Sequence, residues 1–159
     1  MGQAFLIVVV ALTLIGTVLQ AHGYWQRYRV VSTIAKDDIT RIERGVSMRV
    51  MVQGITGMPG MKERRGNRTR GDLVLTKDRF LLTSRRGTLA DLTPNGGRRF
   101  TSVRCTGPGR LIIEGDVPRN SGQNGLYRFE IVVERADQWV DALKDFVQEG
   151  GQVVSFAAP

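Results

Sequence analysis

The N-terminal segment is an uncharged, almost wholly apolar run that covers residues 4–21 and reads AFLIVVVALTLIGTVLQA. As a helix, this run would be about 27 Å long at 1.5 Å per residue, close to the ~30 Å thickness of a bilayer core. Thr13 and Thr17 are compatible with such a helix, because their hydroxyls can bond back to helix carbonyls. The run therefore predicts a transmembrane helix over residues 1–25, with Tyr24 and Trp25 as an interfacial aromatic belt.

A cleaved signal peptide is the alternative, and it requires basic residues before the apolar run and small residues at the cleavage site. The leader Met1-Gly2-Gln3 has no basic side chain, and cleavage after Ala21 would leave Leu19 at the −3 position. Both features favour an uncleaved anchor. Basic residues follow the run from Arg27 onward and none precedes it. The positive-inside rule then predicts a single-pass membrane protein whose C-terminal domain is cytoplasmic.

The charge balance favours anionic partners. The chain carries a net charge of +8, and residues 51–104 hold 12 basic against 4 acidic side chains. Lipid headgroups, acidic proteins and nucleic acid all suit such a field. No aromatic platform, zinc-ligand spacing or recognition helix accompanies the charge, which argues against nucleic acid. Cys105 is the only cysteine and His22 the only histidine, so neither a disulfide, a metal site nor any other cofactor is predicted.

The residues after the apolar run predict a small domain of the α+β class that is mainly β. Residues 26–45 are expected to form a helical stalk, since residues 26–44 contain neither Gly nor Pro. From residue 46 the hydrophobic period becomes two, as Met48, Val50 and Val52 show. Residues 53–71 contain five glycines and predict a long exposed loop. Strands are expected over residues 72–76, 80–84, 99–105, 110–114 and 126–134. The strands 72–76 and 80–84 are expected to form a hairpin.

An amphipathic helix is expected over residues 136–148, before a tail of residues 151–159. Its apolar side chains recur at i, i+3, i+4, i+7 and i+8, which is the stripe of a helix that packs on a core. They are Trp139, Ala142, Leu143, Phe146 and Val147.

Two segments resemble pleckstrin-homology-like domains of the GRAM and bacterial type. The stretch GDLVLTKDRFLLTSRRG, residues 71–87, is similar to their β-hairpin, and YRFEIVVERADQWVDALKDFVQ, residues 127–148, is similar to their last strand and closing helix. The resemblance implies a bent β-barrel over residues 46–150 that the C-terminal helix caps, with Trp139 facing inward. The loop of residues 53–71 is longer than the compact hairpin of many members of that family.

The candidate site begins with the densest group of cations, Lys62, Arg64, Arg65, Arg68 and Arg70, which the resemblance places on the loop between the first two strands. Arg85 and Arg86 flank a turn and are expected to extend the same positive face. Arginine forks match phosphate and carboxylate geometry. The candidate anion-binding residues are Lys62, Arg64, Arg65, Arg68, Arg70, Arg85 and Arg86. A solvated loop is the alternative interpretation of these charges.

No pair or triad of side chains in the sequence has the spacing of a catalytic site, so the chain is not expected to be an enzyme. The predicted function is a membrane-anchored accessory subunit whose helix packs in, and whose pleckstrin-homology-like domain docks on, a larger membrane protein complex such as a respiratory or photosynthetic assembly. The alternative is a module that binds anionic lipid headgroups at the cytoplasmic leaflet.

Overall fold

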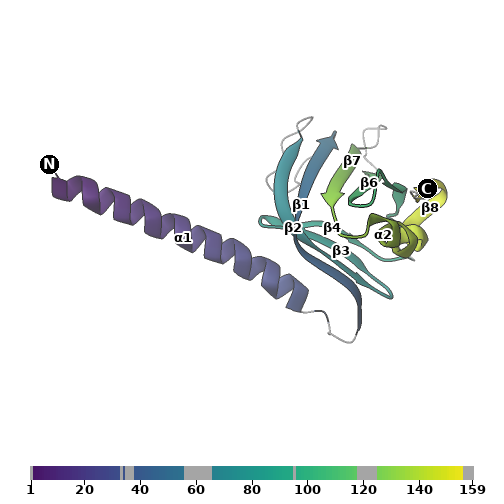
Figure 1. Ribbon diagram of the computed structural model, residues 1–159, viewed down its shortest axis with the longest axis horizontal. Helices are drawn as coiled ribbons and strands as arrows, with labels where there is room; N and C mark the ends of the chain where they lie inside the picture. The colour runs from purple at the N-terminus through teal and green to yellow at the C-terminus, as the bar shows by residue number, and fades with distance from the viewer. Residues whose placement is uncertain are drawn as a thin grey trace.

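A long N-terminal helix leads into a curled β domain in the computed structural model of the chain (Figure 1). The structure describes residues 2–32, 34, 38–55, 66–94, 96–117 and 125–155. Its elements are α1 (Gly2–Ser32), β1 (Ile39–Gln53), β2 (Asn67–Thr76), β3 (Phe80–Ser84), β4 (Gly87–Leu92), β5 (Phe100–Cys105), β6 (Arg110–Val117), β7 (Gly125–Val132), α2 (Ala136–Leu143), the 3₁₀ helix η2 (Lys144–Phe146) and β8 (Val147–Val154).

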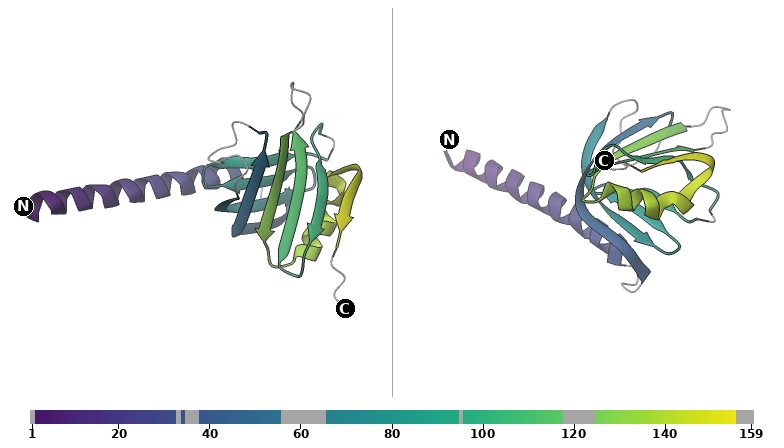
Figure 2. Two further views of the ribbon diagram at one scale, coloured as in Figure 1. Left: turned by 90° about the horizontal axis from the view of Figure 1, so that it is seen from above. Right: turned by 45° about the vertical axis from the view of Figure 1, so that its right-hand side comes forward.

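The described strands form one sheet in the order β4-β3-β2-β1-β7-β6-β5-β8. Neighbouring strands are antiparallel, except that β8 runs parallel to β5. The sheet curls strongly, as both views in Figure 2 show. The curl brings together side chains from strands that are distant in the sheet order. The rings of Phe80 on β3 and Phe100 on β5 meet edge to face, with their centroids 5.4 Å apart.

The concave face of the sheet holds the core, and α2 lies within the curl. Val50, Phe129, Ile131 and Ile113 point into this core and are fully buried. On α2 the residues that face the sheet are Ala136, Trp139, Val140 and Leu143, all of them buried. The inward position of Trp139 was predicted from the spacing of the apolar residues, and the structure confirms it.

The first half of β1 bends across to meet α2. Gly45 makes the bend possible, because its φ of 67° is disfavoured for residues with a side chain. Its N–H donates to the Asp72 carboxylate at 2.8 Å, which satisfies the backbone at the bend. Beyond the bend, the Glu43 carboxylate accepts the indole N–H of Trp139 at 2.5 Å and the backbone N–H of Glu134 at 3.2 Å. One glutamate therefore ties β1 to the start of α2.

A second, small apolar cluster covers the convex face of the sheet near α1. Val74 and Leu81 point away from the main core, yet both are buried. Ile34, Ile39 and Ile42 cover them. The chain after α1 is thus held against β2 and β3 by apolar contacts.

The prediction of a transmembrane helix is corrected by the structure. Within the described residues, none of the helices combines the length and the apolar character that a membrane crossing requires. The expectations of a single-pass membrane protein and of a cytoplasmic orientation, which both relied on that helix, are not supported.

Other segments also differ from the sequence-based expectation. The stretch of residues 26–45, expected to be a helical stalk, is divided between the end of α1 at Ser32 and the start of β1 at Ile39. Strand β4 follows β3 directly, where no strand was predicted. The C-terminal helix ends at Leu143, and Val147–Val154 form strand β8 in place of the last helical turn and the beginning of the tail. The curled sheet is compatible with the pleckstrin-homology resemblance only loosely, so that resemblance stays a hypothesis.

Candidate anion-binding site

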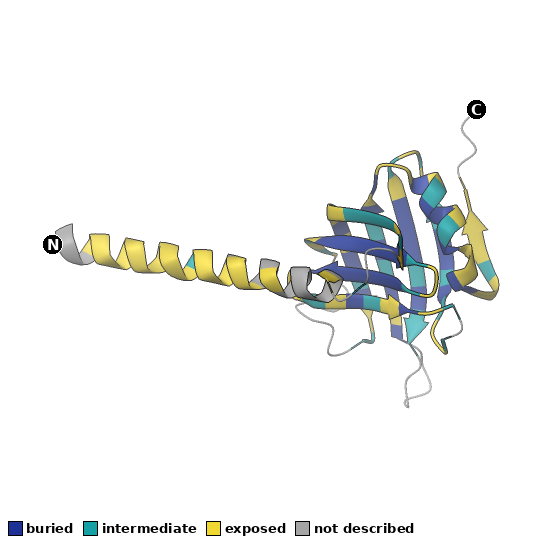
Figure 3. Ribbon diagram, turned by 90° about the horizontal axis from the view of Figure 1, so that it is seen from below, coloured by how far each residue is buried: buried dark blue, intermediate teal, exposed yellow. Residues whose placement is uncertain are grey.

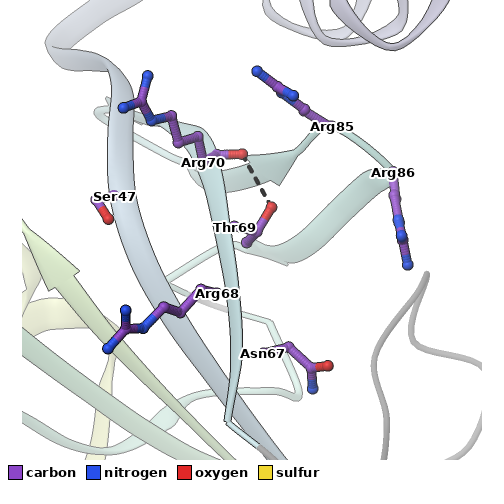
Figure 4. Close-up of a pocket in the computed structure, with 7 residues that line it drawn as sticks. All are labelled: Ser47, Asn67, Arg68, Thr69, Arg70, Arg85 and Arg86. Atoms are coloured by element: carbon purple, nitrogen blue, oxygen red, sulfur yellow. Dashed lines mark hydrogen bonds between the residues drawn. The ribbon is translucent and has the colours of Figure 1, made fainter. Parts of the chain in front are cut away.

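A hollow of about 520 Å³ lies between the beginning of β2 and the turn that joins β3 to β4. Figure 4 shows its lining residues, four of which are arginines. They are Ser47, Asn67, Arg68, Thr69, Arg70, Arg85 and Arg86. No carboxylate is among these lining residues, so the formal charge of the lining is wholly positive.

The pairing of β1 with β2 fixes the first two arginines. Ser47 lies opposite Arg70, and Arg49 lies opposite Arg68. Successive side chains of a strand alternate between its two faces, so Arg68 and Arg70 project from the same face, about 6.7 Å apart along β2. Both are exposed, whereas Thr69 between them is half-buried.

The β3–β4 turn presents the other two arginines. The Ser84 hydroxyl donates to the carbonyl of Gly87 at 3.1 Å and accepts the backbone N–H of Arg86 at 3.2 Å. Gly87 has a φ of 136°, which favours glycine in this tight turn. Ser84 is buried, so the base of the turn is anchored while Arg85 and Arg86 extend into solvent.

The four guanidinium groups spread over the hollow and do not converge on one point. In Figure 4, Arg70 and Arg85 hold theirs at one end of the hollow, Arg86 extends toward the other end, and Arg68 leans toward β1. Each planar fork can take two oxygens of a carboxylate or a phosphate. This arrangement suits several anionic groups on an extended partner better than one small anion.

The structure brings together part of the predicted site. Arg68, Arg70, Arg85 and Arg86 line one hollow, although Arg85 lies 15 residues after Arg70 in the chain. Lys62, Arg64 and Arg65, also predicted, lie outside the described residues. Ser47, Asn67 and Thr69 were not predicted as site residues. Residues 67–70 had been assigned to a loop, and the alternation of Asn67 and Thr69 with two arginines was the signal that could have indicated a strand.

A second hollow, of about 480 Å³, lies at the end of β1, β6 and β7, and its charged side chains are paired with one another. The Arg128 guanidinium contacts Glu114 at 3.3 Å and Glu130 at 2.9 Å, and Arg104 contacts Glu114 at 3.2 Å. Because these side chains neutralise one another, this hollow has less excess charge to offer an ionic ligand than the arginine hollow.

Tyr127 lines the second hollow from the core side, and its ring lies over Gly115. Burial raises the pKa of its hydroxyl, the charge of Asp116 raises it further, and Arg98 opposes this rise. In the unfolded chain the hydroxyl ionises near pH 10, so above that pH the unfolded state binds fewer protons than the folded state. The raised pKa of Tyr127 therefore contributes to the free energy of unfolding below about pH 10, and this contribution is lost as the pH rises further.

Tyr127→Phe is expected to remove this loss. The free energy of unfolding, from urea titrations, should fall less for the variant than for the wild type between about pH 9 and about pH 11. Titrations at about pH 8 serve as the reference, because Tyr127 is neutral in both states there. An identical pH dependence for the two proteins would show that Tyr127 ionises freely in the folded state.

Across the described residues, His, Cys, Asp and Glu side chains nowhere gather in groups of three that could hold a metal ion. Cys105 is buried in the core. No protein-family model matches this chain, and none of the characterised proteins with which its sequence was compared gives a significant match.

Proposed function

We propose that this protein is a non-catalytic accessory subunit whose helix α1 packs into an apolar surface of a larger protein assembly and so holds the β domain beside that assembly. The observation that carries the proposal is the exposure of apolar side chains along α1. Phe5 is 73% exposed, Leu12 64% and Leu19 66%. Figure 3 shows this exposure along the described helix.

The apolar side chains of α1 are spread around the whole helix and form no single stripe. The two threonines do not interrupt this surface. The Thr13 hydroxyl donates to the Val9 carbonyl and the Thr17 hydroxyl to the Thr13 carbonyl, each at 2.8 Å. A helix that is apolar on all sides is found buried, because water would have to solvate its entire surface. A partner that surrounds α1 therefore explains it better than one that covers a single face.

The alternative, a module that binds lipid headgroups, is favoured by the arginine hollow. A single headgroup phosphate is compact, however, and could not contact four guanidinium groups that point in different directions. Headgroup binding in the hollow would also leave the exposed apolar side chains of α1 unexplained. We therefore place assembly first and treat the hollow as a docking surface.

Leu12→Glu tests the proposal. A glutamate at this position would have to be buried without a counter-ion, at a cost of several kcal/mol, which corresponds to a more than tenfold loss of binding. We expect the tagged full-length chain, extracted from its native cells in mild detergent, to co-purify in fixed stoichiometry with its partner subunits. The variant should lose them while the β domain keeps its melting temperature.

Leu126→Glu is the matched control, because Leu126 is 52% exposed on the β domain and distant from α1 in the sequence. This variant should keep the partners. Photo-crosslinkers placed in turn at Leu12 and Leu14, which face different sides of the helix, should both capture the same subunits. Crosslinks to lipid alone, or extraction of the wild type as a free monomer, would contradict the proposal.

A further inference from the structure

An acidic surface lies on the opposite side of the β domain from the arginine hollow. Exposed carboxylates recur every fourth residue through α2, η2 and the start of β8, preceded by one more before α2. This acidic row consists of Glu134, Asp137, Asp141, Asp145 and Glu149. Arg135 and Lys144 are exposed on the same segment, so the five carboxylates outnumber the cations by three. The molecule is thus electrically polar across its β domain.

The two surfaces also face away from each other. β2 and the β3–β4 hairpin lie on the side of the domain that α1 joins, and α2 with β8 lies on the far side, as Figures 1 and 2 show. A chain of this shape cannot pair its own row with its own hollow. A second copy of the chain can.

The spacing of the opposite charges matches. Asp137 and Asp141 are separated by one helical turn, a rise of about 6 Å. Arg68 and Arg70 project from one face of β2 about 6.7 Å apart. Two adjacent carboxylates of the acidic row could therefore each meet one arginine fork, and Arg85 lies at the same end of the hollow as Arg70, where a further carboxylate could reach it.

We propose that the arginine hollow of one copy of this protein binds the acidic row of a second copy, head to tail. Because the hollow and the acidic row are different surfaces, each copy at the end of a dimer still has one of them unoccupied. The same contact can therefore repeat and form a chain of subunits. Exposed ion pairs are individually weak and screened by salt. The association should therefore depend on concentration and ionic strength. It does not rest on the burial of α1.

The test uses the full-length chain in a non-ionic detergent that covers α1 in every sample, so the outcome is independent of the proposed partner of α1. Sedimentation velocity at low salt should show wild-type species that grow beyond the dimer with protein concentration and revert to monomer in ~0.5 M salt, where the screening length is only a few Å. The hollow variant carries Arg68→Glu and Arg70→Glu. The row variant carries Asp137→Arg and Asp141→Arg. Each alone should stay monomeric.

An equimolar mixture of the two variants is the decisive sample. The intact row of the hollow variant can meet the intact hollow of the row variant, and the two charge-reversed surfaces are complementary to each other as well. The mixture should therefore regain the salt-sensitive association that each variant alone has lost. Circular dichroism of each variant must match the wild type, and Arg68→Lys with Arg70→Lys, which keeps the charge, should still associate.

Three results would overturn the proposal. The wild type could remain monomeric at the highest concentration, the variants could associate as the wild type does, or the mixture could stay monomeric. If the monomeric wild type instead binds vesicles that contain anionic lipid, or inositol hexaphosphate, and the hollow variant does not, the hollow is a phosphate site and not a contact between copies.

Discussion

Trp139→Ala is expected to lower the free energy of unfolding of the β domain by ~3–5 kcal/mol, the range for truncation of a buried tryptophan. The side chain is fully buried between α2 and the sheet. Its indole N–H donates to Glu43 at 2.5 Å, and the guanidinium of Arg41 lies 5.2 Å from the ring centroid. The substitution therefore leaves a cavity and takes a donor from a half-buried carboxylate. Urea denaturation followed by circular dichroism measures the change.

Trp25→Ala is the matched control, since Trp25 is 56% exposed and the chain has two tryptophans. Its effect should stay within about 0.5 kcal/mol. Trp139→Phe separates packing from hydrogen bonding, because it keeps an aromatic ring but has no N–H to offer Glu43. Its loss should be clearly smaller than that of the alanine variant. Equal stability of Trp139→Ala and the wild type would contradict the role of α2 as the element that closes the core.

Strong local periodicity is what made parts of the fold predictable from the sequence. Strand β7 alternates Tyr127, Phe129 and Ile131 with polar residues, and the structure buries those three side chains in the core. The apolar stripe of α2 likewise placed Trp139 correctly. In both elements one face packs against a single core, so the spacing of the apolar residues shows which face is buried.

Segments stabilised mainly by distant contacts were not predictable in this way. Strand β8 contains Gly150 and Gly151 and mostly exposed residues, and it is a strand because it pairs in parallel with β5. Ile39 and Ile42 were expected in a helix, and they lie in β1 because they cover Val74 and Leu81 on the convex face. Local propensity gives way to tertiary contacts in such cases.

The candidate site was predictable as a set of charges and not as a geometry. The density of cations indicated an anionic partner, and Arg68, Arg70, Arg85 and Arg86 do share one hollow. Their directions depend on the strand that begins at Asn67 and on the turn that Ser84 stabilises, and neither feature can be read from charge density. The sequence left both an anionic lipid headgroup and an acidic protein open as the partner, and the spread of the four guanidinium groups favours the extended row of carboxylates that we propose.

Gly71→Ala is expected to destabilise the β domain by at least ~3 kcal/mol, at or above the upper end for overpacking in a core. A Cβ at this buried position would lie 1.7 Å from the carbonyl oxygen of Thr83 and 2.6 Å from the terminal methyl of Met48. The Met48 methyl can move, but the Thr83 carbonyl belongs to the backbone of β3. The paired strands β2 and β3 would have to move apart at this point, which would also disturb the position of the β3–β4 turn.

Gly97→Ala provides the matched control, because a Cβ there would have no neighbour within 4 Å. Its effect should lie within about 0.5 kcal/mol of zero, as at other unconstrained surface positions. Urea denaturation compares the two variants, and hydrogen exchange should show faster exchange of the β2 and β3 amides in Gly71→Ala alone. Because β2 carries Arg68 and Arg70 and β3 ends at the turn with Arg85 and Arg86, that variant should also lose the head-to-tail association without any change in charge. Normal stability and normal association of Gly71→Ala would show that the close approach of β2 to β3 does not position the arginine hollow.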